Sequence, residues 1–264
     1  MRGSADRRTS CAQRVRFACS GVEIGVIDSA INPDLAVFQG ADLTVHEPAF
    51  CGGPAATTTA TTDSVHGSDV TALLVGNGTG PGAVRGAAPG AAVTFYGIDA
   101  GSEAGSSSSC NTEIGGRTYS AIGRAIRQAV ADGNRVISIS LVSSAQNDGD
   151  IHAVTQALAR GIVIVAGGEN STIETTSPFP HRANGVVSVN AIKEDGSLQT
   201  QGGGGVAAFR STTVVAGGWG FSSQAAVKPA IAWGDNAVRI AGSSLARITS
   251  CCGRTTATAT EPRR

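Results

Sequence analysis

The sequence predicts an α/β protein with a doubly wound, mostly parallel sheet and helices on both of its faces. Short apolar runs rich in β-branched residues are typical of buried parallel strands. Five such runs occur, at residues 22–27, 93–98, 136–141, 162–166 and 186–189. Helical patterns lie between several of them, and strands that alternate with helices form right-handed βαβ units.

Two stretches carry the helical pattern. Four apolar residues fall on one face of the stretch 119–132, namely Ile122, Ile126, Ala129 and Val130. Gly133 supplies a stop signal. The stretch 151–160 repeats this design and ends at Gly161. Residues 54–63 and 101–116 are predicted to be loops.

Composition limits the classes of function. A chain of 264 residues with 41% hydrophobic content is long enough to bury one core, so a single domain over residues 21–250 is expected. Basic and acidic residues number 20 each, so no net field attracts nucleic acid or a membrane surface. No run of about eighteen apolar residues exists, so no membrane span is expected. No carboxylate cluster has calcium-site spacing, and neither a metal nor a cofactor is predicted.

The ends differ from the middle of the chain. The segment 2–16 holds five Arg and one Asp, and it is interpreted as part of a disordered basic extension over residues 1–20. Its charges interrupt any apolar run, so it does not form a signal peptide. Residues 251–264 are expected to be an unstructured tail. Six cysteines allow fifteen pairings.

Three separated segments supply an acid, a base and a nucleophile. Asp28 directly follows an apolar strand pattern, so its carboxylate is expected at the carboxyl edge of the sheet. His66 is predicted to open a helix, with Ser64 as a possible N-cap and Gly76 as the stop. Ser244 lies in the small-residue segment 242–246.

The order Asp, His, Ser on an α/β pattern resembles that of the subtilisin-like serine peptidases. The family patterns D-[ST]-G, H-G-T and G-T-S-x-A are matched by DSA at Asp28, HGS at His66 and GSSLA around Ser244. The segment GIVIVAGGEN, residues 161–170, is similar to the family segment that ends in the oxyanion-hole asparagine, which places Asn170 there. The text around residues 85–90 is similar to the family's G-x-A-P.

The resemblance implies a serine endopeptidase that acts on polypeptides. Ser244 would attack, His66 would accept its proton, and Asp28 would orient His66. Asn170 and the backbone N–H of Ser244 would hold the oxyanion. Glu169 stands where the family has glycine, and its carboxylate would oppose the developing charge if it pointed inward.

Substrate binding is expected at Ser140, Leu141 and Val142, where the family has S-L-G. Val142 in place of glycine would narrow the cleft and favour small substrate residues. The alternative is that the strand ends one residue earlier.

The resemblance also bears on disulfides and location. Cys51 and Cys110 lie in loop-like sequence within the region that resembles the family, and they are the pair expected to form a disulfide bond. A disulfide indicates an oxidising compartment. The family resemblance implies a secreted or cell-surface protein, although this sequence shows no signal peptide. Oligomeric state is left open.

The sequence after Ala246 does not match the family. The family's nucleophile begins a long buried helix, whereas residues 247–264 form no apolar helical stripe. This favours a C-terminally truncated member with an incomplete nucleophile helix. The Arg-rich usage, with only two Lys, indicates an actinobacterial-type coding sequence. A catalytically inactive remnant that binds peptides is therefore the alternative function.

Overall fold

The computed structural model describes residues 19–79, 84–99, 110–143, 147–168, 179–192, 197, 213–217, 230–233 and 236–239. Most of the predicted N-terminal extension, up to residue 18, and the whole predicted tail, 251–264, lie outside these residues. Among the part described, no helix is both long and apolar enough to cross a bilayer.

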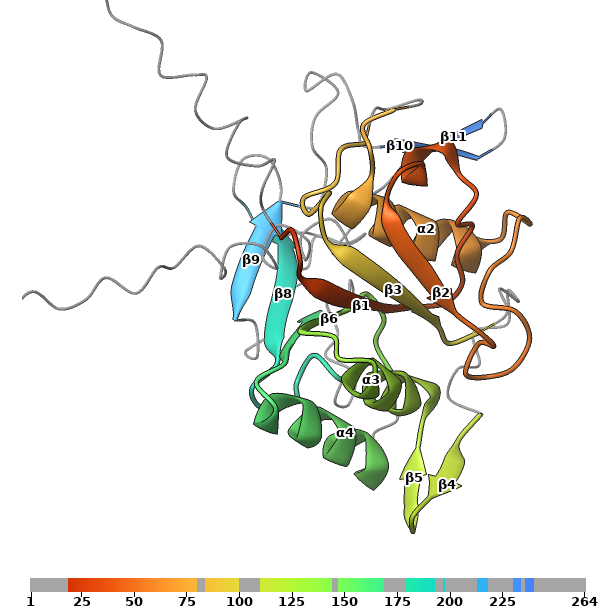
Figure 1. The fold of residues 1–264 in the computed structure, drawn as a ribbon. Helices are drawn as coiled ribbons and strands as arrows, with labels where there is room; N and C mark the ends of the chain where they lie inside the picture. Colours follow the sequence, from red (N-terminus) through yellow and green to blue (C-terminus); the bar gives the residue numbers. More distant parts are fainter. Residues whose placement is uncertain are drawn as a thin grey trace, which may run out of the picture.

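A seven-stranded sheet forms the centre of the molecule, in the order β2-β3-β1-β6-β7-β8-β9 (Figure 1). Every neighbouring pair is parallel. The strands are β1 (Glu23–Asp28), β2 (Asp42–His46), β3 (Ala92–Gly97), β6 (Val136–Ile139), β7 (Val163–Gly167), β8 (Val187–Ile192) and β9 (Val214–Gly217). After β1 the chain places β2 and β3 on one side of it and β6 to β9 on the other, so β1 lies where the strand order reverses. Open α/β sheets place their sites at the carboxyl end of the strands at this point.

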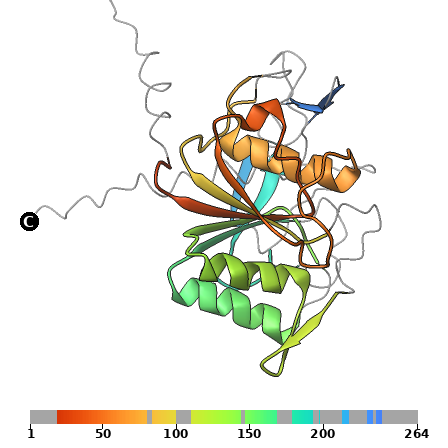
Figure 2. The ribbon, with the colours of Figure 1, turned by 45° about the vertical axis from the view of Figure 1, so that its right-hand side comes forward.

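Helices cover both faces of the sheet, as predicted. Helix α2 (Thr62–Val75) lies on one face, and α3 (Ala121–Ala131) and α4 (Asp148–Ala159) lie on the other (Figure 2). A short 3-10 helix, η2 (Ala36–Phe38), lies near α2. The predicted doubly wound α/β fold is confirmed.

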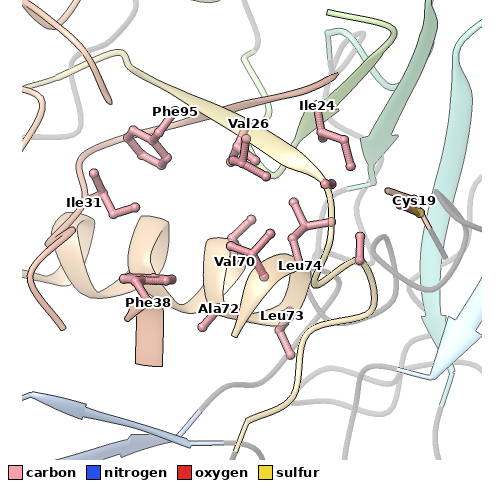
Figure 3. Packing of buried hydrophobic residues seen from close by; sticks show 14 of the residues in the cluster. Cys19, Ile24, Val26, Ile31, Phe38, Val70, Ala72, Leu73, Leu74 and Phe95 are labelled. Atoms are coloured by element: carbon pink, nitrogen blue, oxygen red, sulfur yellow. The ribbon is translucent and has the colours of Figure 1, made fainter. Parts of the chain in front are cut away.

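The core divides at the sheet because strand side chains alternate between its faces. Ile24 and Val26 of β1 join the cluster that contains α2, whereas Ile27 joins the cluster that contains α3 and α4. Figure 3 shows Val70 and Leu74 of α2 facing Val26 and Ile24. Helix α2 is therefore packed directly beneath the strand that ends at Asp28.

The predicted helices and strands are present with shifted ends, and the structure contains several strands that were not predicted. Helix α2 begins at Thr62, before His66, because Thr61 and Ser64 form a capping box; the predicted N-cap Ser64 is the third helical residue. Strand β2 was missed because an edge strand need not be continuously apolar. The predicted loop 101–116 includes β4 (Thr112–Ile114), which forms a hairpin with β5 (Arg117–Tyr119). A further antiparallel pair, β10 (Ala230–Trp233) and β11 (Asn236–Arg239), was also not predicted.

Candidate active site

The carboxyl end of β1 and helix α2 bring the predicted acid and base together. The Nδ1–H of His66 donates to Oδ1 of Asp28 at 2.8 Å. Since a carboxylate can only accept, Nδ1 carries the hydrogen and Nε2 is the acceptor nitrogen of this tautomer. In this tautomer Nε2 can accept a proton, which is the form that a general base requires.

Burial differs sharply across this pair. The Asp28 side chain is 0% exposed and that of His66 is 38% exposed. Oδ1 of Asp28 also accepts from the backbone N–H of Ser29 at 2.8 Å, which fixes the carboxylate against its own strand end. A buried anion beneath a partly exposed imidazole stabilises the imidazolium without itself meeting solvent.

Gly67 explains how α2 comes so close to β1. A Cβ at this position would lie 2.1 Å from the carbonyl oxygen of Ala30 and 2.9 Å from Cζ of Phe95. Only glycine permits this approach without displacement of the backbone. The helix is then tied down by Ser68, whose hydroxyl donates to the Ser64 carbonyl at 2.6 Å and accepts from the Asn32 N–H at 3.0 Å.

One of the predicted substrate-binding residues, Ser140, lies level with the aspartate of this pair. Ile27 of β1 pairs in register with Ile139, the last residue of β6, so Ser140, the residue after β6, lies level with Asp28. Ser140 is buried, and Val142 is 37% exposed. Strand β6 ends before all three residues, and Ser143 then pairs with Phe179 in an antiparallel bridge.

Two predicted site residues, Ser244 and Asn170, lie outside the described residues, as does Glu169. Strand β7 leads toward Asn170 in the sequence: it ends at Gly167, and Ala166 pairs with Ile139 of β6. Of the four predicted catalytic residues, the structure therefore brings together Asp28 and His66.

Asp69 is a site residue that the sequence reasoning missed. It lies one helical turn after His66 and is only 7% exposed. Burial raises its pKa to about 7; positive charge on His66 lowers the pKa, and Asp28 raises it. The signal available in the sequence was a carboxylate one turn past the histidine, directly before an apolar run.

The predicted disulfide is present. Cys51 and Cys110 are bonded, with their Cα atoms 5.5 Å apart. The bond joins the loop after β2 to the start of the β4–β5 hairpin. Within the part of the chain that the structure describes, no group of three or more His, Cys, Asp or Glu side chains is placed to hold a metal ion.

A buried aspartate that is hydrogen-bonded to a histidine at the carboxyl edge of a parallel sheet is an arrangement found in several α/β hydrolases, and comparison with known proteins narrows this to one family. Residues 19–251 match the model of the Subtilase family. This chain belongs to the Subtilase family, a family of serine peptidases.

Curated relatives are similar over most of this chain. Alkaline elastase YaB of Bacillus sp. (strain YaB) is 29% identical over 191 residues, which cover 72% of this chain and 44% of that protein. Subtilisin DY of Bacillus licheniformis is 31% identical over 179 residues, which cover 66% of this chain and 57% of that protein. The chain thus spans about half the length of these relatives.

Solved structures share the fold. A point mutant of the protease domain of PatA has a TM-score of 0.66 at 19% identity and covers 88% of this chain and 77% of its own. Sphericase has a TM-score of 0.61 at 24% identity and covers 89% of this chain and 76% of its own.

Proposed function

We propose that this chain is a serine endopeptidase that hydrolyses peptide bonds through Asp28, His66 and Ser244, with Asn170 as an oxyanion donor. The observation that carries the proposal is the 2.8 Å hydrogen bond between a fully buried Asp28 and the Nδ1 of His66 at the carboxyl edge of the sheet. Family membership supports the assignment of Ser244 as its nucleophile.

In the proposed reaction, Nε2 of His66 takes the proton of the Ser244 hydroxyl as its oxygen attacks the substrate carbonyl. Asp28 holds the tautomer and stabilises the imidazolium. The side-chain amide of Asn170 and the backbone N–H of Ser244 donate to the oxyanion. His66 then returns its proton to the leaving amine, and water releases the acyl group by the same steps.

Substrate would bind along Ser140, Leu141 and Val142. The position of Ser140 level with Asp28 supports this, because a peptide there lies beside the reacting groups. The exposed, β-branched side chain of Val142 favours a small substrate residue before the scissile bond. The disulfide supports a secreted or cell-surface location.

A fluorophosphonate probe tests the nucleophile. It is expected to label Ser244 in the folded protein, and labelling is expected to vanish in Ser244→Ala and in His66→Ala. Asp28→Asn should retain the fold and lower kcat/KM on a peptide amide by about 10⁴-fold, because it presents the wrong tautomer. A folded protein that is inert to the probe and to peptide substrates would favour a non-catalytic role.

Specificity is tested separately. Val142→Gly should raise kcat/KM for substrates with a large residue before the scissile bond more than for those with alanine. An unchanged ratio between the two substrates would refute the role of Val142.

A further inference from the structure

Asp69 is a buried carboxylate that has no role in the reaction proposed above. It lies on the turn of α2 that follows His66, and residues three apart on a helix are neighbours. Its Oδ1 is fully buried and makes no hydrogen bond within the described part of the protein. A buried carboxylate oxygen without a donor strongly disfavours ionisation.

The titratable groups that act on Asp69 are few. His66 lies three residues before it on the same helix, and Asp28, at the end of β1, acts on it through space. Asp63 is the other charged residue of α2, in the first turn. The elements η2 and β10, which also contact α2, contain no titratable side chain, and Tyr96 of β3 belongs to the cluster on the opposite face of the sheet.

Coupling between two such groups is reciprocal. Positive charge on His66 lowers the pKa of Asp69, so an ionised Asp69 must raise the pKa of His66 by the same interaction. Asp28 acts on the ring through a direct hydrogen bond, whereas Asp69 acts on it through space. Asp69 is buried and His66 is 38% exposed, so solvent screens this second interaction less than it would screen a pair on the surface.

We propose that Asp69 is a positioning residue that controls the protonation of His66: the two residues lie one helical turn apart on α2, and the negative charge of the buried Asp69 carboxylate retains a proton on the imidazole. The consequence for catalysis rests on the proposed function. A protonated His66 cannot act as a base, so Asp69 moves the lower limit of activity to higher pH. Once His66 has accepted the Ser244 proton, an ionised Asp69 also stabilises the imidazolium.

The coupling can be measured without turnover. In a Ser244→Ala background, the His66 imidazole is followed by NMR against pH, with its signals assigned by comparison with His66→Ala. Asp69→Asn is expected to lower the pKa of His66 by about one unit. The exposed Asp42→Asn, which makes the same change in net charge, should shift it by less than about 0.2 units. A His66 pKa that is unchanged or higher in Asp69→Asn would overturn the proposal.

A second variant tests whether the shift comes from loss of the Asp69 charge or from hydrogen bonds made by the new Asn amide. Asp69→Ala removes the same charge and should lower the pKa of His66 in the same direction. If both variants leave it unchanged, the burial of Asp69 has no electrostatic effect on the catalytic base and the proposal fails.

Activity gives an independent readout. With Ser244 present, the acid limb of the pH profile of kcat/KM should move to lower pH in Asp69→Asn by the same interval. A uniform loss of activity with no movement of the limb indicates a structural role alone and overturns the proposal. If the parent protein shows no activity, the proposed function has failed, while the NMR titration still decides the role of Asp69.

Discussion

Asp28 and Asp69 are two buried carboxylates beside one histidine, and they differ in what stabilises their charge. Oδ1 of Asp28 accepts from His66 and from the backbone N–H of Ser29, whereas its Oδ2 is buried without a hydrogen-bond partner among the described residues. Asp69 has its Oδ1 buried without a donor in the described region, and burial raises its pKa to about 7. Asp28 is therefore held by two hydrogen bonds to one oxygen, whereas the ionised form of Asp69 is disfavoured by its burial.

The raised pKa of Asp69 makes stability depend on pH. The folded state prefers the protonated form of Asp69. The contribution of Asp69 to the free energy of unfolding is therefore fully present below about pH 4 and is lost as the pH rises through about 7. The loss amounts to as much as about 4 kcal/mol. Asp69→Asn should therefore melt like the parent at pH 4 and at a higher temperature at pH 8, as measured by calorimetry in the Ser244→Ala background. A Tm difference that does not grow with pH would contradict this prediction.

At the scale of elements, Gly67 sets how closely α2 approaches β1. Gly67→Ala would place a Cβ 2.1 Å from the Ala30 carbonyl oxygen, so the helix or the strand end must move. We expect the free energy of unfolding to fall by about 2 kcal/mol or more, and probe labelling to slow by at least tenfold as the His66–Asp28 pair is displaced. Helix propensity alone predicts the opposite, a gain of about 1 kcal/mol. Urea denaturation of Gly67→Ala therefore distinguishes the two expectations, because one predicts a decrease and the other an increase in the free energy of unfolding.

Asp150 joins the starts of the two helices on the other face. Its Oδ1 accepts from the Ser120 N–H at 2.9 Å, and its Oδ2 accepts from the Asn147 N–H at 3.3 Å; Ser120 and Asn147 are the N-caps of α3 and α4. Asp150→Ala leaves two N–H groups without their acceptor and should cost about 2–4 kcal/mol in urea denaturation. Asp150→Asn retains one oxygen acceptor and should cost about half as much. Equal stability of the alanine variant and the parent would be inconsistent with this role.

At the scale of the whole molecule, the Cys51–Cys110 disulfide closes a loop across a sequence separation of 59 residues. Loss of a crosslink over this length should lower the free energy of unfolding by about 4 kcal/mol in the chain-entropy model. Cys51→Ser and Cys110→Ser should each lose as much as the double variant, because either change removes the whole bond. A double variant as stable as the parent under oxidising conditions would rule out this contribution.

Local patterns were enough to predict the sheet and its main helices. The runs that became β1, β3, β6, β7 and β8 are apolar because parallel strands are buried on both faces, and that composition is visible in one dimension. Strand β2 is at the edge of the sheet, so DLTVH carries no comparable signal. The β4–β5 hairpin was missed because its strands have three residues each and follow closely on the Gly- and Ser-rich segment 101–109, which resembles a loop.

By itself the sequence determined the residues that could serve as acid and base, because Asp28 and His66 each stand in a recognisable local motif and both proved to be in contact. It also predicted the Cys51–Cys110 pair. Only the tertiary structure decided that Gly67 is required for a close approach to Ala30, and that Asp69 is buried where the charges of His66 and Asp28 act on it. The physical reason is that a close approach and a pKa depend on what surrounds a residue in space, and those neighbours come from strands and helices distant in the chain.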